Sequence, residues 1–391
     1  MSGRTRGAAR AAQRPQRSAR AVAVDALLRI DDGAYANLVL PHLLERSGLG
    51  DADRRFVTEL VYGTTRARRL LDAMIDPFLV RDVDPRTRAG LRLGAYQLVV
   101  LGTPPHAAVS ATVDAVGGRA RGLVNAVLRR IATAPPTPPD EASRLSYPDW
   151  IVDRMVADVG YDRAIRALEA MNGRAETHVR DDGYVQDPAS LAVVDLVGAR
   201  PDEVVVDVCA APGGKATALA ASGCRVVAVE LQAARARLLE RNRVVTGAEG
   251  MAVLRADGRA LPLRSGCADR VLLDAPCSGL GSLRRRPDAR WRIDEAGPER
   301  LAVLQRELLV EARRVLRPGG TLVYSVCTLT AVETLDVDRW AEANFPDLGA
   351  VPVPAGPAAP VGWEPCGRGA LALPTDGGAD GMFVLVLRHV G

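Results

Sequence analysis

Two cysteines lie where apolar runs give way to small and polar residues. Cys277 lies in the run DAPCSG of residues 274–279, and Cys327 lies in the run YSVCT of residues 324–328. In an open parallel sheet the ligand crevice lies outside the carboxyl ends of the strands, so thiols at two such ends can face one substrate. Because a thiol at that place is a candidate nucleophile, the pair predicts covalent catalysis at a sheet edge.

The elements that would position these thiols alternate between strand-like and helical patterns from residue 204 onward. The expected strands are 204–208, 225–229, 252–254, 270–274 and 321–324, with 383–387 as a late antiparallel addition, and the expected helices are 216–221, 232–245 and 298–315. This alternation is typical of βαβ units around a buried parallel sheet. We therefore expect an α/β domain in the second half of the chain.

A loop of small residues follows the first of these strands. It consists of Cys209, Ala210, Ala211, Pro212, Gly213, Gly214 and Lys215. Paired glycines let the backbone approach a ligand at a helix N-terminus. The loop lacks the G-x-G-x-x-G spacing of the dinucleotide fingerprint, and Ala216 follows the lysine where a phosphate-binding P-loop has Ser or Thr. A nucleotide-phosphate site is therefore disfavoured.

Carboxylates mark the next strand ends. Glu230 ends the second strand, where a carboxylate can accept both ribose hydroxyls of a nucleoside, and Asp257 follows the third strand, a place suited to an adenine amino group. A lone acid at a strand end is commonly a surface charge or a helix cap. Acids in register at successive strand ends favour a nucleoside site instead.

Lys215 is the only lysine in a chain with 51 basic residues. Its presence among so many arginines indicates a place that needs a compact ammonium, although chance is an open alternative. The other cysteines (209, 224, 267 and 366) have no such flanking signals, and we expect them to serve as small buried hydrophobes. With no C-x-x-C and four scattered histidines, we expect no metal site.

Composition places the chain among ordinary globular proteins. Its 391 residues are 48% hydrophobic and 25% charged, enough for two or three domains. No run approaches the span of about 18 apolar residues that a membrane helix needs, and no secretory h-region is present. These features predict a cytoplasmic protein with no membrane partner, and we expect it to be a monomer.

The sequence pattern predicts five consecutive segments. Residues 1–20 hold six arginines and no acid, and predict a disordered basic tail; a merely solubilising segment or an organellar transit peptide is an alternative. Residues 21–133 follow a helical period, and 134–145 form a proline-rich linker. Residues 146–185 form a short, helical pre-domain, and 186–391 form the α/β domain.

On these motifs the chain resembles the S-adenosylmethionine-dependent RNA 5-methylcytosine methyltransferases, and among them the bacterial 16S ribosomal RNA enzymes. The glycine loop and DAPCSG carry the α/β half of the resemblance, and the N-terminal half is similar to NusB-like domains in residues 34–38, 59–64, 91–98 and 124–130. The resemblance implies an all-α NusB-like RNA-binding domain followed by a Rossmann-like class I methyltransferase domain. It also implies S-adenosylmethionine contacts from Cys209 to Lys215 and from Glu230, Asp257 and Asp274.

The same resemblance assigns roles to the two thiols. Cytosine C5 is a poor nucleophile, so a thiolate must first add to C6 and make C5 enamine-like. The family implies that Cys327 is the attacking thiol and that Cys277 assists product release. Asp274 would hydrogen-bond the cytosine edge near N3, with Lys215 in a supporting role.

Two departures from the family pattern concern the substrate. Val326 replaces the usual threonine before the second cysteine, and residues 177–187 run directly from the start of the usual RNA-binding pre-domain to its end. RNA docking would then rest on the NusB-like domain, the basic tail and the arginine loop 283–288. That loop either contacts phosphate or is a solvated turn.

The predicted function is cytosine-C5 methylation of RNA, with 16S ribosomal RNA as the expected target. A different RNA such as tRNA is an alternative, and so is a non-catalytic NusB-like assembly factor. Methylation of another base or of an amide nitrogen is disfavoured, because such sites carry a second proline at the position of Cys277.

Overall fold

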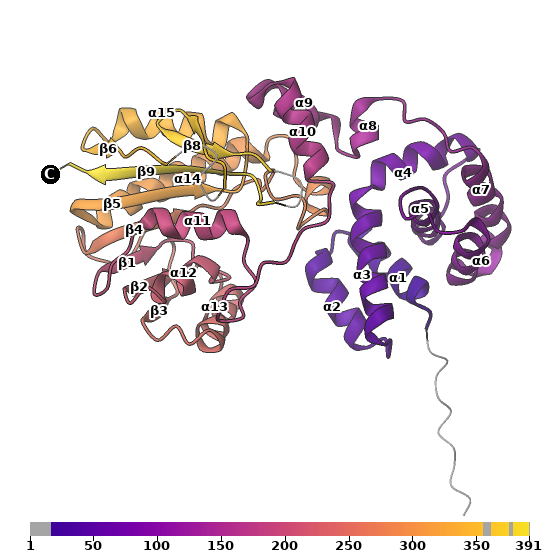
Figure 1. Ribbon diagram of the computed structural model, residues 1–391, viewed down its shortest axis with the longest axis horizontal. Helices are drawn as coiled ribbons and strands as arrows, with labels where there is room; N and C mark the ends of the chain where they lie inside the picture. The colour runs from indigo at the N-terminus through magenta and orange to yellow at the C-terminus, as the bar shows by residue number, and fades with distance from the viewer. Residues whose placement is uncertain (1–16, 355–360, 375–377, 391) are drawn as a thin grey trace, which may run out of the picture. The chain divides into compact units, whose positions relative to one another are not determined.

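The computed structural model describes residues 17–354, 361–374 and 378–390, and the chain divides into two compact units, Met1–Ser146 and Tyr147–Gly391 (Figure 1). Most of the predicted basic tail, residues 1–16, lies outside the described residues. The predicted tail boundary at residue 20 is wrong, since helix α1 begins at Ala19. The Ser18 hydroxyl caps this helix by accepting from the Ala21 amide, which is the reason the helix begins there.

The first unit is all helical within its described residues, which confirms the prediction for 21–133. Its helices are α1 (Ala19–Asp31), α2 (Ala36–Glu45), α3 (Asp51–Arg66), α4 (Arg68–Ile75), α5 (Pro85–Val99), α6 (Pro105–Val116), α7 (Arg121–Thr133) and α8 (Glu141–Leu145), with short 3-10 turns η1 (Asp76–Phe78) and η2 (Gly118–Ala120). Helix α5 buries nearly every residue from Ala89 to Gln97. It is therefore the central helix around which α1, α4, α6 and α7 pack.

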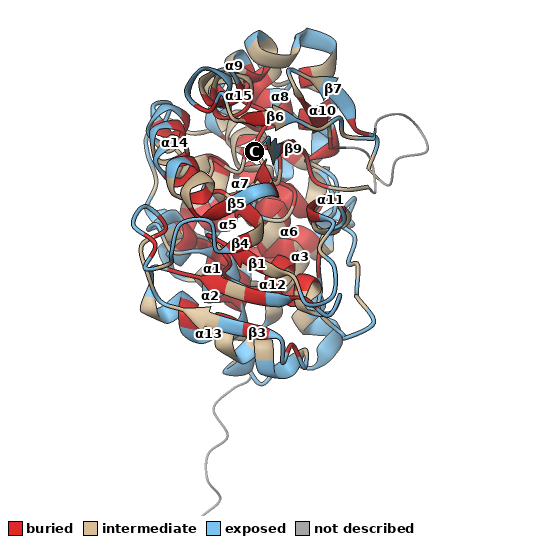
Figure 2. Ribbon diagram, turned by 90° about the vertical axis from the view of Figure 1, so that its left-hand side faces the viewer, coloured by how far each residue is buried: buried red, intermediate tan, exposed pale blue. Residues whose placement is uncertain are grey.

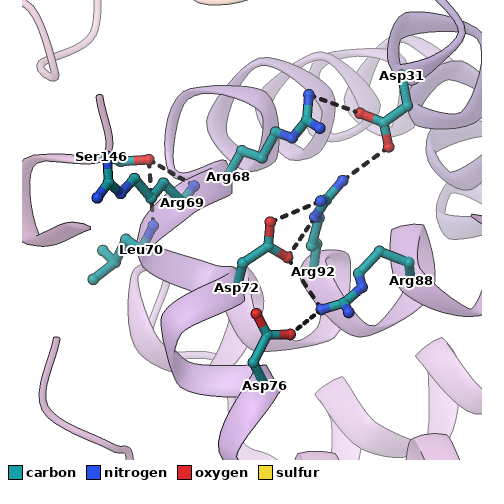
Figure 3. Close-up of polar contacts among 9 residues, drawn as sticks. All are labelled: Asp31, Arg68, Arg69, Leu70, Asp72, Asp76, Arg88, Arg92 and Ser146. Atoms are coloured by element: carbon teal, nitrogen blue, oxygen red, sulfur yellow. Dashed lines mark hydrogen bonds and ion pairs between the residues drawn. The ribbon is translucent and has the colours of Figure 1, made fainter. Parts of the chain in front are cut away.

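An arginine inside this unit joins three helices. Figure 3 shows Arg92 of α5 between Asp31 at the end of α1 and Asp72 of α4. Its Nη1 lies 2.9 Å from Asp31 Oδ2, and its Nε and Nη2 make a bidentate pair with Asp72 at 2.8 and 2.7 Å. Two planar hydrogen bonds to one carboxylate fix the orientation of both helices as well as their separation.

The linker is shorter than predicted. Helix α8 occupies 141–145, because the Asp140 carboxylate accepts from the Ser143 amide and starts a helical turn. Ser146 follows in a left-handed conformation, and its hydroxyl accepts from the Arg69 amide at the start of α4 (Figure 3). The extended proline segment therefore ends at Asp140.

The second unit begins with helices α9 (Asp149–Val159) and α10 (Tyr161–Ala170) and then builds a mixed sheet. Its strands are β1 (Val204–Asp207), β2 (Arg225–Val229), β3 (Met251–Leu254), β4 (Ala268–Asp274), β5 (Leu316–Val326), β6 (Leu348–Ala350), β7 (Glu364–Cys366), β8 (Gly369–Ala372) and β9 (Met382–His389). Its other helices are α11 (Pro188–Val197), α12 (Gly214–Ala220), α13 (Ala233–Val245), α14 (Gly297–Val315) and α15 (Leu335–Asn344), with 3-10 turns η3 (Ala289–Trp291) and η4 (Ala331–Glu333).

The strand order is β3-β2-β1-β4-β5-β9-β8-β7, with β6 also paired to β9. Strands β3, β2, β1, β4 and β5 are parallel, and β9 joins β5 antiparallel with Val323 opposite Val386. Residues of β1 and β4 are mostly buried, as buried strands of a covered parallel sheet should be (Figure 2). The predicted α/β fold and the antiparallel addition are both confirmed.

This strand order fixes where a ligand can bind. The chain passes from β1 to β2 on one side and later returns to β4 on the other side of β1. Such a reversal opens a crevice outside the carboxyl ends of the strands at the switch point. No helix in the described part of the chain has the length and apolar composition that a membrane crossing requires.

Candidate active site

A cavity of about 670 Å³ lies at the carboxyl ends of β1, β2, β4 and β5. Of the predicted residues it is lined by Cys209, Ala211, Pro212, Glu230, Asp257, Asp274, Cys277 and Cys327. Leu304 and Leu308 of α14 and Leu231 after β2 add apolar wall. The structure therefore gathers the predicted nucleoside acids and both predicted thiols around one space.

Four predicted cofactor residues do not line that cavity within the described structure: Ala210, Gly213, Gly214 and Lys215. Gly213 has φ of +115° and is the N-cap residue before α12, and a Cβ on it would lie 2.8 Å from Leu239. A Cβ on Gly214 would lie 3.1 Å from Tyr184. Gly213 is thus needed for the backbone conformation before α12, and both glycines are needed where neighbouring side chains pack against the loop. The spacing in the sequence did not distinguish these roles from contact with a ligand.

The sulfur atoms of Cys277 and Cys327 lie 3.4 Å apart. The hydrogen bond from the Cys277 thiol lowers the pKa of Cys327 against the effect of burial, and the Ser282 hydroxyl, 3.6 Å from the Cys327 sulfur, acts in the same direction. For Cys277 that hydrogen bond, burial and nearby negative charge all raise the pKa. The arrangement favours a thiolate at Cys327 and a thiol at Cys277.

The Lys215 side chain pairs with Asp274, which lines the same cavity as the two thiols. Its Nζ donates to Asp274 Oδ2 at 2.7 Å, and the Ser325 hydroxyl donates to Asp274 Oδ1 at 2.8 Å. Burial lowers the pKa of Lys215, but the Asp274 carboxylate outweighs burial and raises the pKa overall. The lysine is therefore a buried cation, and its charge also lowers the pKa of Cys327.

The two acids that are predicted to bind a nucleoside are held by backbone amides. Glu230 is almost completely buried, and its Oε1 accepts from the Gln232 amide at 2.7 Å. Asp257 Oδ1 accepts from the Arg259 amide at 2.9 Å, and the Arg259 guanidinium also pairs with this carboxylate. Each carboxylate oxygen carries more than one lone pair, so both acids can still accept from ribose hydroxyls or an adenine amino group.

Asp207, which the sequence interpretation did not select, ends β1 beside this site. Both of its carboxylate oxygens are buried. Burial followed by the nearby Asp274 charge raises its pKa to about 7, although the Lys215 charge and the Cys209 backbone amide act in the opposite direction. A buried carboxylate of this kind attracts a cationic group. Together with the acids and apolar walls of the cavity, it fits a ligand that combines a nucleoside with a positively charged portion.

The arginine loop 283–288 is mostly structural, so its prediction as a phosphate contact needs correction. Arg284 is buried and donates to the Gly378 carbonyl, and Arg285 pairs with Asp187 and Asp380. Arg286 is exposed and lines the cavity. Of this loop only Arg286 is therefore placed to reach a phosphate beside the thiols.

A set of buried polar residues behind the thiols was also missed. It comprises Ser278, Gln305, Tyr324, Thr328, Thr330 and Glu333. The available signal was that a hydroxyl residue follows each cysteine, Ser278 after Cys277 and Thr328 after Cys327. Their hydroxyl oxygens lie 2.8 Å apart.

Two other features concern the predictions directly. Val326, at the position of the expected threonine, is fully buried in β5 opposite Phe383, so this side chain packs in the core. Among the described residues no group of three or more His, Cys, Asp or Glu side chains is arranged to hold a metal ion.

Comparison with known proteins gives the family. Residues 194–388 match the family described as 16S rRNA methyltransferase RsmB/F, and residues 17–133 match the NusB family. Ribosomal RNA small subunit methyltransferase B of Thermus thermophilus is 38% identical, over 95% of this chain and 98% of that protein. The chain belongs to the RsmB/F methyltransferase family.

Other members and structures agree with this assignment. A protein of the same name from Sodalis glossinidius is 30% identical, over 93% of this chain and 96% of its own length. The crystal structure of PH0851 superposes with a TM-score of 0.76 at 22% identity, over 94% of this chain and 98% of that one, and so shares the fold. The predicted NusB-like and Rossmann-like architecture and the prediction of an RNA methyltransferase of the RsmB/F family are confirmed.

Proposed function

We propose that the protein transfers a methyl group from S-adenosylmethionine to C5 of a cytosine in 16S ribosomal RNA, through a covalent bond between Cys327 and cytosine C6. The observation that carries the proposal is the thiol pair, 3.4 Å apart in the cavity that Asp274 also lines. RsmB/F membership supports both the methyl donor and the RNA substrate.

The cavity suits this methyl donor. Glu230 would accept the ribose hydroxyls, Asp257 would accept the adenine amino group, and the leucines of α14 would cover the base. Asp207 supplies negative charge beneath the loop, where a ligand ammonium would neutralise it. When bound, S-adenosylmethionine supplies an electrophilic methyl group on a sulfonium.

The first step is addition of the Cys327 thiolate to C6. A bond forms between Sγ and C6, and the electron pair of the C5–C6 double bond moves toward C5 and the ring edge. The charge delocalises onto N3, where a proton from solvent would bind until the product is released, and Asp274, which lines the cavity, would accept a hydrogen bond from that N3–H group. The Lys215 ammonium neutralises Asp274 when the ring is absent and so keeps the carboxylate in place.

Carbon C5 would then take the methyl group as the methyl–sulfur bond of the donor breaks and leaves a neutral thioether. The ring must afterwards lose the C5 proton and the cysteine sulfur. A base removes the C5 proton, its electron pair re-forms the C5–C6 double bond, and the Sγ–C6 bond breaks to return the Cys327 thiolate. Cys277, held as a thiol beside that sulfur, would assist this release.

The target cytosine must leave its stack to reach these groups, since C6 is inaccessible in a paired helix. Arg286 at the cavity rim would bind a phosphate next to the flipped nucleotide. The NusB-like unit would add sequence-independent RNA contacts, which matter more here because the pre-domain is short.

The test is incubation of purified protein with isotopically labelled S-adenosylmethionine and unmethylated 30S subunits, 16S ribosomal RNA and tRNA, followed by nucleoside mass spectrometry. Labelled 5-methylcytosine in 16S ribosomal RNA supports the proposal. Label confined to tRNA would contradict the proposed substrate, and no label in any RNA would favour a non-catalytic assembly factor.

A further inference from the structure

Glu333 is fully buried in η4, next to the cysteine loops, and its carboxylate accepts four hydrogen bonds. Oε1 accepts from the Ser278 amide at 2.8 Å and from Gln305 Nε2 at 3.0 Å. Oε2 accepts from the Ser278 hydroxyl at 2.5 Å and from the Thr330 hydroxyl at 2.9 Å. This carboxylate is thus the common acceptor for segments far apart in the sequence.

These donors come from both cysteine loops. Ser278 follows Cys277, and its hydroxyl lies 2.8 Å from that of Thr328, which follows Cys327. Because an ionised carboxylate can only accept, Ser278 must donate to Glu333, and Thr328 must then donate to Ser278. The charge of Glu333 therefore sets the direction of a chain that runs from one cysteine loop to the other.

The same residue also connects α14 to the loops. Gln305 Nε2 donates both to Glu333 and to the carbonyl of Pro276, at 2.9 Å, directly before Cys277. The Tyr324 hydroxyl lies 2.7 Å from the Glu333 carbonyl. Hydrogen bonds at Pro276 and at Ser278 therefore hold the loop on both sides of Cys277.

Glu333 differs from most buried carboxylates in its partners. The hydrogen bonds to its carboxylate in the described structure all come from neutral groups, whereas a buried anion is usually paired with a cation. No cation among the described residues donates to this carboxylate, although the Arg306 charge acts on the neighbouring Tyr324. The negative charge of Glu333 raises the pKa of Cys277 and so disfavours a second thiolate. The other charged or titratable groups that act on the two thiols are Asp274, Lys215 and Tyr324.

We propose that Glu333 is a positioning residue that holds the two cysteine loops at reacting distance and keeps Cys277 a neutral thiol while Cys327 attacks. This proposal rests on the proposed cytosine methylation. Glu333 does not line the cavity among the described residues, so it acts through Ser278, Thr328 and the field at Cys277.

The experiment compares wild type with Glu333→Gln, Glu333→Asp and the surface control Glu249→Gln. We measure kcat and KM for methyl transfer, and the pH dependence of iodoacetamide labelling at each cysteine by peptide mass spectrometry. In Glu333→Gln we expect kcat to fall about 30-fold with KM for S-adenosylmethionine within about twofold, because transition-state geometry and not cofactor binding is lost. Labelling of Cys277 should shift to lower pH by about one unit, since the nearby charge is gone.

Glu333→Asp keeps the charge, so we expect its Cys277 labelling profile to stay near wild type while kcat falls. Glu249→Gln should match wild type in every measurement. An unchanged kcat together with an unchanged Cys277 profile in Glu333→Gln would overturn the positioning role.

Two further results keep the test decisive. If circular dichroism shows that Glu333→Gln is unfolded, Ser278→Ala replaces it in the test. This variant breaks the chain of hydroxyl groups but leaves the Glu333 charge, so kcat should fall while the Cys277 labelling profile stays unchanged. An unchanged kcat would overturn the proposal. If wild type transfers no methyl group to cytosine, the proposed function fails, whereas the labelling profiles still report whether Glu333 controls Cys277.

Discussion

The loops that carry Cys277 and Cys327 place two chemically identical groups 3.4 Å apart in different surroundings. The hydrogen bond between the two thiols lowers the pKa of Cys327, as do the Ser282 hydroxyl and the Lys215 charge, whereas that hydrogen bond, burial and the Glu333 charge raise the pKa of Cys277. Different surroundings thus make Cys327 the better candidate for the proposed nucleophile and Cys277 the better candidate for the proposed release residue.

The largest expected effect comes from removing each thiol in turn. Cys327→Ala should lose methyl transfer by about 10,000-fold, because no other group can form the bond to C6. The Cys277→Ala variant keeps Cys327, so it should still form the bond to C6 and methylate C5. Without the release residue it should accumulate a covalent RNA adduct that resists denaturant. Label transfer and denaturing gels measure both effects. Cys267→Ala is the control, because Cys267 is exposed and not the buried hydrophobe that the sequence predicts.

Equal losses of transfer in both variants, with no adduct from either, would contradict this division of labour. Normal transfer by Cys327→Ala would remove the assigned nucleophile altogether.

A smaller effect is expected when the cation on the Cys327 side is removed. Lys215→Met leaves the Asp274 charge unpaired at the site and removes a group that favours the thiolate, so kcat should fall about 100-fold. The pH at which iodoacetamide labels Cys327 should rise, while Cys277 should change less. A Cys327 profile that does not move would show that Lys215 serves only to hold Asp274.

The smallest effect concerns Ser282. Transfer by wild type should rise with pH as Cys327 loses its proton and level off below the pH range of an ordinary cysteine, because its pKa is lowered. Ser282→Ala removes one hydrogen bond to that sulfur, so the rise should move to higher pH by about half a unit. A pH profile of kcat/KM measures the shift, and Ser265→Ala on the surface is the control. A shift to lower pH would contradict the direction of this hydrogen bond.

Much of this site could be predicted because its residues carry local signals. The acids follow apolar strands, both cysteines lie at strand ends, and a parallel sheet brings successive strand ends to one edge. The glycine loop was also found, but Gly213 and Gly214 face Leu239 and Tyr184 instead of the cavity. Which side of a loop a residue faces depends on tertiary packing.

The residues that could not be predicted depend on partners distant in the sequence. Glu333 resembles a surface acid in sequence, and its burial follows from donors at Ser278 and Gln305. Arg285 is neutralised by Asp187 and Asp380, so an apparently basic loop keeps little free charge. Polar side chains are commonly exposed, and sequence does not show which ones find buried partners.

Attack on the base by Cys327 can be tested on the covalent adduct itself. Cys277→Ala is incubated with S-adenosylmethionine and substrate RNA, denatured, digested with nuclease and protease, and the modified peptide is sequenced by mass spectrometry. We predict a methylated cytidine remnant on the peptide at Cys327. A remnant on any other residue, or labelled 5-methylcytosine formed without a cysteine adduct, would contradict it.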